Sequence, residues 1–183
     1  MNMVQPIRDP KQIKAMKKLL KTKNDKYYIM FIIGINIGLR ISDILLLKVS
    51  DIKEKTHVTI IEKKTKKTKR FLINTQMQKE LQDYIMRYQK KDEEYLIKSH
   101  KGKNQPISRV QAYRVLQDAA KELGLSEVGT HTMRKTFGYW HYQRFHDIAL
   151  LQDMFNHSST SITLRYIGMN DDMKDQAMKD FFL

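Results

Sequence analysis

The chain has 183 residues, which is enough to bury one hydrophobic core, and we expect a single domain over residues 1–183. Its formal net charge of +14 and its pI near 9.8 make a polyanion the expected partner, with nucleic acid ahead of a membrane surface. The absence of cysteine excludes disulfides and thiolate metal sites. No apolar signal-peptide core and no run near the roughly 20 residues of a spanning helix is present, so we expect a soluble, intracellular protein without a membrane partner.

Two helices are expected at the N-terminal end. Asp9 followed by Pro10 is typical of a helix start, with the aspartate as the N-cap. The second helix, from about Asp25 to Gly38, is apolar on most of its faces, which indicates a central position in the fold. Gly38 then allows the backbone to turn.

Arg40 lies at the junction between this central helix and a short third helix, which we expect Ser42 or Asp43 to cap. An arginine packed there loses hydration unless it has a partner, such as Asp43 or a bound phosphate. An ordinary buried ion pair and a phosphate site both remain open for this segment.

A change to β-branched residues predicts a β-hairpin, with strands near residues 57–61 and 71–73. Between them, six of the eight residues from Lys63 to Arg70 are cations. Charge at a sheet edge protects against aggregation, but this density exceeds that need. We therefore expect DNA contacts from this turn at Lys63, Lys66, Lys67, Lys69 and Arg70.

A helix is predicted over residues 75–89, and another begins after the cap Ser108 and ends at Gly124. Arg109 and Arg114 mark the polar side of the later helix. Cationic side chains of this kind position a protein on DNA through phosphates rather than by reading bases. Both arginines are therefore predicted DNA contacts.

Three short helices are predicted after Gly129. The first is expected to be capped by Thr130, the second to cover residues 147–155, and the third to begin near Thr160. Singly, a histidine or tyrosine in such a helix is more often a polar surface or core residue. Together, these helices can surround one phosphate with two histidines, an arginine and an attacking tyrosine, namely His131, Arg134, His157 and Tyr166.

The order His-x-x-Arg, then Asn-His, then tyrosine nine residues after that histidine resembles the C-terminal signature of the tyrosine recombinases, the phage integrase family. Gly-Leu-Arg at residues 38–40 resembles the first arginine box of the same family, and the lysine-bearing hairpin resembles its β2-β3 turn. The resemblance covers essentially the whole chain. It implies six catalytic residues: Arg40, Lys64, His131, Arg134, His157 and Tyr166.

Lys64 is selected by counting back from Leu72 and Ile73, and Lys63 is its rival because a slip of one residue moves a side chain to the other face. The resemblance also implies that Asp43 orients Arg40. Lys135 stands where many members of the family have histidine, and we expect it to contact DNA. Asn156 stands where glycine is common, and neither departure removes a catalytic group.

The implied fold is mainly α with a small antiparallel β-sheet, an α+β catalytic domain. The implied activity is site-specific cutting and rejoining of DNA through a 3′-phosphotyrosyl intermediate, with no metal, ATP or other cofactor. The implied partners are double-stranded DNA and further copies of the chain, with four protomers on two duplexes. An accessory DNA-bending protein or a separate DNA-clamping domain is also compatible, and the expected location is the cytoplasm, at the nucleoid.

Other classes of protein share part of this pattern. A DNA-binding regulator without cleavage would be expected to lack one of the six residues, and a type IB topoisomerase would relax supercoils without exchanging strands. A metal-dependent nuclease is disfavoured because no acidic or histidine cluster has convincing ligand spacing. The amphipathic tail over about residues 171–183, with Met173, Ala177 and Phe181 at a spacing of four, either docks on a neighbouring protomer or folds back on its own domain.

Overall fold

The computed structural model describes residues 4–61, 68–179 and 181–182 of the chain. Helices dominate this part of the chain and accompany one antiparallel hairpin, so the predicted α+β fold is confirmed. In chain order the elements are α1 (Pro10–Lys23), α2 (Asp25–Ile37), α3 (Ile41–Ile44), the short 3-10 helix η1 (Val49–Asp51), β1 (His57–Ile61), β2 (Thr68–Leu72), α4 (Thr75–Arg87), α5 (Arg109–Glu122), α6 (Thr130–Phe145), α7 (Ile148–Phe155), α8 (Thr160–Tyr166) and α9 (Met169–Lys179).

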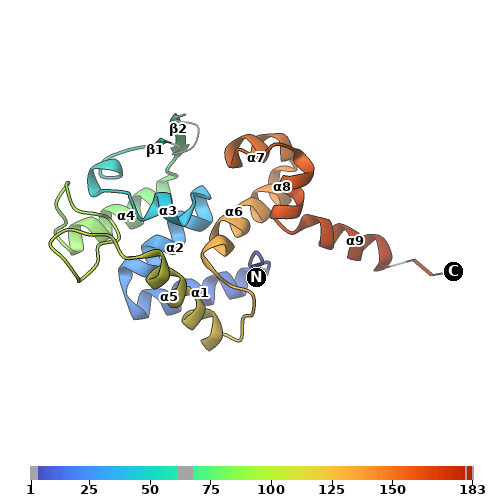
Figure 1. Ribbon diagram of the computed structural model, residues 1–183, viewed down its shortest axis with the longest axis horizontal. Helices are drawn as coiled ribbons and strands as arrows, with labels where there is room; N and C mark the ends of the chain where they lie inside the picture. Colours follow the sequence, from blue (N-terminus) through green and yellow to red (C-terminus); the bar gives the residue numbers. More distant parts are fainter. Residues whose placement is uncertain (1–3, 62–67, 180, 183) are drawn as a thin grey trace.

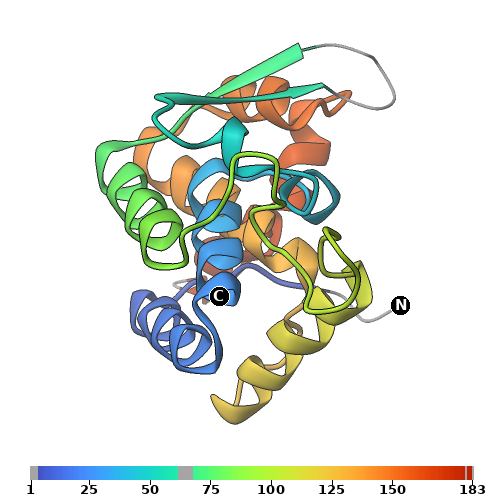
Figure 2. The same cartoon turned by 90° about the vertical axis from the view of Figure 1, so that its left-hand side faces the viewer.

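The hairpin pairs β1 with β2, with His57 opposite Leu72 and Ile61 opposite Thr68. Its second strand begins earlier than predicted, because the ladder continues through the basic residues before Phe71. The hairpin lies beside α7 (Figures 1 and 2), where the Lys69 ammonium donates to the Asp153 carbonyl. The predicted general acid Lys64, its rival Lys63 and the predicted DNA contacts Lys66 and Lys67 lie outside the described residues.

Helix α2 occupies the centre of the fold, as its apolar sequence predicts, and its side chains are buried on most faces. It ends at Gly38, which adopts a left-handed conformation with φ of 72°. A Cβ atom at this position would lie 2.3 Å from Cδ1 of Phe137 on α6. Glycine is therefore required here both for the turn and for the close approach of α6.

Helix α6 joins two hydrophobic clusters. The large core surrounds α2 and includes Met133 from α6. The small cluster consists of four buried residues, Leu151, Phe155, Ile167 and Met169, with partly buried aromatic side chains around them. Gly138 lets α6 approach this small cluster, since a Cβ atom there would lie 2.6 Å from Ile167 and 2.9 Å from Phe155.

The predicted caps Asp9 and Ser108 accept backbone N–H groups at the starts of α1 and α5, as expected. The predictions that Ser42 or Asp43 caps α3 and that Thr130 caps α6 are wrong. Helix α3 begins directly after Arg40, whose carbonyl accepts from the N–H of Asp43 and of Ile44.

Helix α6 begins after Gly129, because the Thr132 hydroxyl accepts the Gly129 N–H at 3.0 Å and so fixes the first turn one residue early.

The last helix, α9, leads away from the body of the molecule (Figure 1). It starts slightly before the predicted tail, at Met169, which is buried in the small cluster. Beyond that point Met173, Met178 and Phe181 are exposed, so the described tail does not fold back over the domain. Within the described ranges, none of the helices combines the length and the apolar character needed to cross a membrane.

Candidate active site

Five of the six predicted catalytic residues lie in the described part of the chain. Arg40 lies just before α3, His131 and Arg134 lie on the first turns of α6, His157 follows α7, and Tyr166 ends α8. The contacts described below connect these five side chains around the C-terminal end of α7. The structure therefore brings together residues that are separated by up to 126 positions in sequence, from 40 to 166.

Arg134 is buried and holds the two sides of this site together. Its guanidinium donates to the carbonyl of Gly38 at the end of α2 and, at 3.1 Å, to the carbonyl of Phe155 at the end of α7. The same group lies over the Phe155 ring, 4.1 Å from the centroid. Because carbonyl groups and an aromatic face both favour a cation, they offset the cost of burying this charge.

Arg40 is exposed and approaches the same carbonyl, with its Nη2 atom 3.5 Å from the Phe155 oxygen. Two guanidinium groups thus converge on one acceptor. Like charges this close repel one another, so an anion placed between them would be strongly favoured. The geometry fits a phosphate.

Tyr166 has its phenol oxygen 3.3 Å from Nδ1 of His131. Loss of hydration raises the pKa of Tyr166, while the positive charges of Arg134 and Arg40 and a hydrogen bond from Arg134 act against that rise. His131 keeps an exposed edge, yet desolvation on its inner side lowers its pKa, and the charges of Arg134, Lys135 and Arg40 lower it further. The imidazole is therefore neutral at neutral pH and able to accept a proton.

His157 packs against Tyr166, with the ring centroids 5.0 Å apart at an interplanar angle of 70°. Burial lowers the pKa of His157, and the charges of Arg134 and Arg40 lower it further. Its Nδ1 atom lies 3.1 Å from the hydroxyl of Thr163, which is also 3.2 Å from the Ser159 carbonyl. A hydroxyl has one proton to donate, so Thr163 donates either to Nδ1 of His157 or to the Ser159 carbonyl. Which of the two accepts determines which ring nitrogen of His157 carries hydrogen.

Asp43 lines a small cavity together with Arg40, Lys69 and Arg134. Its carboxylate accepts from the Ser42 hydroxyl at 3.4 Å, and no ion pair links it to Arg40 among the described residues. The orienting role of Asp43 stays a prediction. Within the same part of the chain, no group of three or more His, Cys, Asp or Glu side chains could hold a metal ion.

Among the described residues, the predicted DNA contacts lie in two regions of the molecule. Lys69 on β2 lines the small cavity with Arg40 and Arg134, and the Lys135 ammonium lies 5.3 Å from the centroid of the Tyr166 ring. The guanidinium of Arg70, the next residue of β2, lies 3.0 Å from Nδ1 of His57. Arg109 and Arg114 are exposed on α5, and Figures 1 and 2 place α5 and the hairpin toward opposite ends of the molecule. Of the predicted DNA contacts among the described residues, Lys69 and Lys135 therefore lie at the candidate site.

Two residues of the site were not predicted from sequence. Phe155 provides the carbonyl that both arginines approach and the ring under Arg134, and Thr163 contacts His157. In sequence, Phe155 is one of several apolar residues of α7, and Thr163 is one of several hydroxyl residues near the start of α8. The available signal was position alone, two residues before His157 and three before Tyr166.

The fold is that of a tyrosine recombinase catalytic domain. The model of the phage integrase family matches residues 8–173. The chain belongs to the phage integrase family.

A probable integrase/recombinase of Bacillus subtilis strain 168, YoeC, is 50% identical over 181 residues, which are 99% of this chain and 98% of that protein. A tyrosine recombinase of Pseudothermotoga lettingae is 28% identical, over 97% of this chain and 65% of its own length.

Two solved structures share the fold at low sequence identity. The XerA recombinase superposes with a TM-score of 0.76 and 20% identity, covering 98% of this chain and 64% of that one. The XerH recombinase, in a post-cleavage complex with a palindromic difH substrate, gives a TM-score of 0.74 and 17% identity, covering 98% of this chain and 54% of that one. The chain thus spans nearly all of YoeC but only about two thirds or less of these other proteins.

Proposed function

We propose that the chain is a site-specific DNA recombinase, a single catalytic domain that cuts and rejoins duplex DNA through a 3′-phosphotyrosyl intermediate on Tyr166. One observation carries the proposal, namely that the phenol oxygen of Tyr166 lies 3.3 Å from Nδ1 of His131 and beside two converging guanidinium groups. A phenol needs its proton removed and a phosphate needs its charge neutralised before one can attack the other. This constellation supplies both.

In the proposed reaction the Tyr166 oxygen attacks the scissile phosphorus, His131 takes the phenol proton, and the bond to the 5′ oxygen breaks. Arg40 and Arg134 bind the non-bridging oxygens and stabilise the charge of the pentacoordinate transition state. Their positive charges also favour the phenolate, which is the direction in which they already shift the pKa of Tyr166. The phosphotyrosyl bond keeps the energy of the broken bond, so a second strand can attack it without ATP or a metal.

His157 donates a hydrogen bond to the phosphate. If the Thr163 hydroxyl donates to the Ser159 carbonyl, its oxygen accepts the Nδ1–H of His157. Nε2 of His157 is then unprotonated in the neutral ring and gains a proton only when the ring is charged. A bound phosphate favours that charged form because it is an anion next to the ring. The alternative, with Thr163 donating to Nδ1, leaves Nε2 protonated in the neutral ring.

Lys64 is the proposed general acid, which protonates the departing 5′ oxygen. The proposal predicts that Lys64→Ala slows cleavage far more than Lys63→Ala, and that a 5′-thiolate leaving group, which needs no acid, restores Lys64→Ala. Rescue of Lys63→Ala instead would shift the register by one residue.

The decisive experiment uses a nicked suicide substrate that traps the covalent intermediate. Wild-type protein is expected to form a protein–DNA adduct in the presence of EDTA and without ATP, while Tyr166→Phe binds DNA equally and forms none. Binding without any adduct would favour a regulator that does not cleave. Supercoil relaxation without strand exchange would favour a topoisomerase.

The proposed partners are duplex DNA and three further protomers, with the reaction taking place at the nucleoid in the cytoplasm. The exposed apolar side chains of Met173, Met178 and Phe181 support docking of the tail on a neighbouring protomer in that assembly. Deleting residues 173–183 is then expected to preserve single-site binding and to abolish synapsis. Normal recombination by the truncated protein would rule out this use of the tail.

A further inference from the structure

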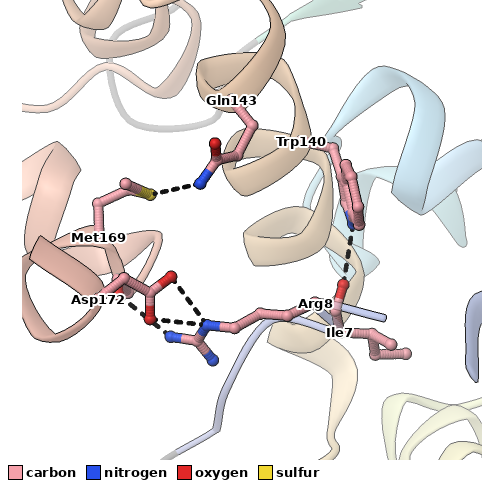
Figure 3. A network of polar contacts seen from close by, with 7 residues as sticks. Ile7, Arg8, Trp140, Gln143, Met169 and Asp172 are labelled. Carbon is pink, nitrogen blue, oxygen red and sulfur yellow. Dashed lines mark hydrogen bonds and ion pairs between the residues drawn. The ribbon is translucent and has the colours of Figure 1, made fainter. Parts of the chain in front are cut away.

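Arg8 connects the beginning of the chain to the segment that directly follows the candidate nucleophile (Figure 3). Its Nε atom donates to both carboxylate oxygens of Asp172, at 3.0 and 3.1 Å, and its Nη2 atom donates to the carbonyl of Gly168 at 3.1 Å. These contacts span 164 and 160 positions of sequence. One guanidinium therefore contacts both the turn between α8 and α9, at Gly168, and the first turn of α9, at Asp172.

The backbone beside Arg8 is itself fixed to α6. The Ile7 N–H donates to the Thr136 hydroxyl at 2.9 Å in a buried contact. The Trp140 indole N–H donates to the Ile7 carbonyl at 2.9 Å (Figure 3). Ile7 is buried as well. Because the backbone at Ile7 is anchored to α6, the Arg8 side chain extends from a fixed position to its contacts with Gly168 and Asp172.

The start of α9, which Arg8 contacts, also packs against α6. The guanidinium lies 5.4 Å from the centroid of the Tyr139 ring, and the Gln143 amide lies 3.6 Å from the Met169 sulfur. Burial raises the pKa of Tyr139, and the charge of Asp172 raises it further, so this phenol stays protonated beside the carboxylate. Helix α6 and the N-terminal segment thus clamp the start of α9 together.

Tyr166 is the last residue of α8, and the held carbonyl belongs to the second residue after it. Gly168 has φ of +80°, and a Cβ atom there would lie 2.6 Å from the Arg8 Nη2 atom. Between them, Ile167 is fully buried against Gly138. Any shift of this turn is therefore transmitted to the Tyr166 phenol over a short, tightly packed segment.

We propose that Arg8 is a positioning residue for the nucleophile, and that it acts by holding Gly168 and Asp172 so that the Tyr166 oxygen stays in line with the phosphate. The inference rests on the proposed function, because it requires Tyr166 to be the attacking group. An ion pair that is one third exposed adds little to global stability. A displacement of about 1 Å at a reacting atom, in contrast, can slow a reaction about a hundredfold.

The test measures adduct formation on the nicked substrate in a single turnover at saturating DNA, together with the DNA dissociation constant. We expect Arg8→Ala to lower the rate constant by about tenfold or more while the dissociation constant changes by less than about twofold. Arg8→Lys is expected to fall between wild type and Arg8→Ala, because one ammonium keeps the charge but lacks the planar fork that reaches both acceptors. The matched control is Arg87→Ala, which removes the 2.8 Å ion pair with Asp25 between α4 and α2 and should leave the rate unchanged.

Trp140 is the single tryptophan of the sequence and contacts Ile7, so its fluorescence reports whether the N-terminal segment stays docked. We expect the emission of Arg8→Ala to match wild type. Asp172→Asn tests the same contact through its other partner, since it weakens the ion pair with Arg8 without altering the N-terminal segment. We expect it to lower the rate constant of adduct formation in the same way. A slow Asp172→Asn variant with unchanged Trp140 emission supports the proposal.

A double-mutant cycle that combines Gly168→Ala with Arg8→Ala tests the proposal further, because the Cβ atom added at position 168 collides with the Arg8 guanidinium. The cost of Gly168→Ala should be smaller in the Arg8→Ala background, although the backbone strain at positive φ remains. Wild-type rates in both Arg8→Ala and Asp172→Asn, or a rate loss fully explained by weaker DNA binding, would overturn the positioning role. Absence of adduct from the wild type, or its persistence in Tyr166→Phe, would overturn the proposed function instead.

Discussion

The large core and the small cluster differ in how firmly they are held. The large core buries aliphatic side chains from α1 to α6, many of them completely. The small cluster has four buried residues and depends on contacts with α6, Arg134 and Arg8. Arg40 follows α2 on the side of the large core, whereas Tyr166 packs against the small cluster and His157 packs against Phe155 and Tyr166.

This difference indicates that the elements of the large core are held rigidly and that Tyr166, the proposed nucleophile, is held by a few specific contacts. Regions with few buried contacts open more easily than the rest of a protein. Local opening of α7 and α8 would therefore move Tyr166 without unfolding the large core. The following variants test that separation.

Arg134→Ala should have the largest effect, because Arg134 bridges the two regions and is also one of the two arginines proposed to bind the phosphate. Loss of its donors leaves the Gly38 carbonyl without this partner and the Phe155 carbonyl with only the longer contact from Arg40, which should lower the free energy of unfolding by about 2–4 kcal/mol. Adduct formation should fall by about a thousandfold or more. Chemical denaturation and single-turnover trapping measure the two effects.

Arg40→Ala is the matched comparison, since Arg40 is exposed and makes one hydrogen bond, at 3.5 Å, within the part of the chain that the structure describes. We expect a stability change within about 0.5 kcal/mol and a loss of cleavage comparable to that of Arg134→Ala. An equal loss of stability in both variants would contradict the view that Arg134 alone bridges the two regions.

Gly138→Ala and Gly34→Ala add one methyl group on either side of the boundary. The Gly138 variant collides with Ile167 and Phe155 in the small cluster, and the Gly34 variant collides with Met133 in the large core. Each should cost about 1–3 kcal/mol. Hydrogen exchange is expected to show local opening of α7 and α8 for Gly138→Ala but a global effect for Gly34→Ala, and identical exchange patterns would mean that the two clusters unfold as one unit.

Thr163→Val should have a smaller effect on stability, about 1 kcal/mol, because it replaces a buried hydroxyl by a methyl group of similar size. The same change removes the partner of Nδ1 of His157, so we expect slower adduct formation and an altered pH–rate profile. NMR titration of the His157 ring checks the tautomer, and an unchanged profile would remove Thr163 from the site.

The smallest expected effect is on the pH dependence of stability. The pKa values of His131 and His157 are lowered from 6.5 in the folded protein, so the unfolded chain binds more protons than the folded protein just below pH 6.5. The free energy of unfolding should therefore decrease as the pH falls below about 6.5 and level off below the folded-state pKa values.

Substituting both histidines by glutamine should reduce this slope. Part of it should remain, because burial also lowers the pKa of His141. A slope of the same size in the double variant would contradict the assignment.

Local signals in the sequence predicted much of this molecule. The apolar run of α2, the turn at Gly38 and the caps Asp9 and Ser108 depend on neighbouring residues, and they are confirmed. The first turn of α6 was placed one residue late, because the Thr132 hydroxyl captures the Gly129 N–H in competition with a cap at Thr130.

Long-range contacts could not be predicted in this way. The roles of Phe155 and Arg8 follow from carbonyl groups and a carboxylate that the folded chain brings from distant positions. Neither residue has an unusual sequence context. The family resemblance predicted the order of the proposed catalytic residues along the chain, but not the contacts that hold them in place.

The central claim is that Tyr166 attacks DNA, and the most direct measurement is the identity of the residue in a trapped adduct. Wild-type protein is incubated with the nicked substrate, the adduct is digested with protease and nuclease, and the modified peptide is sequenced by mass spectrometry. We predict a nucleotide on Tyr166, attached through its 3′ phosphate. A nucleotide on Tyr139 or Tyr142, or attachment through a 5′ phosphate, would contradict it.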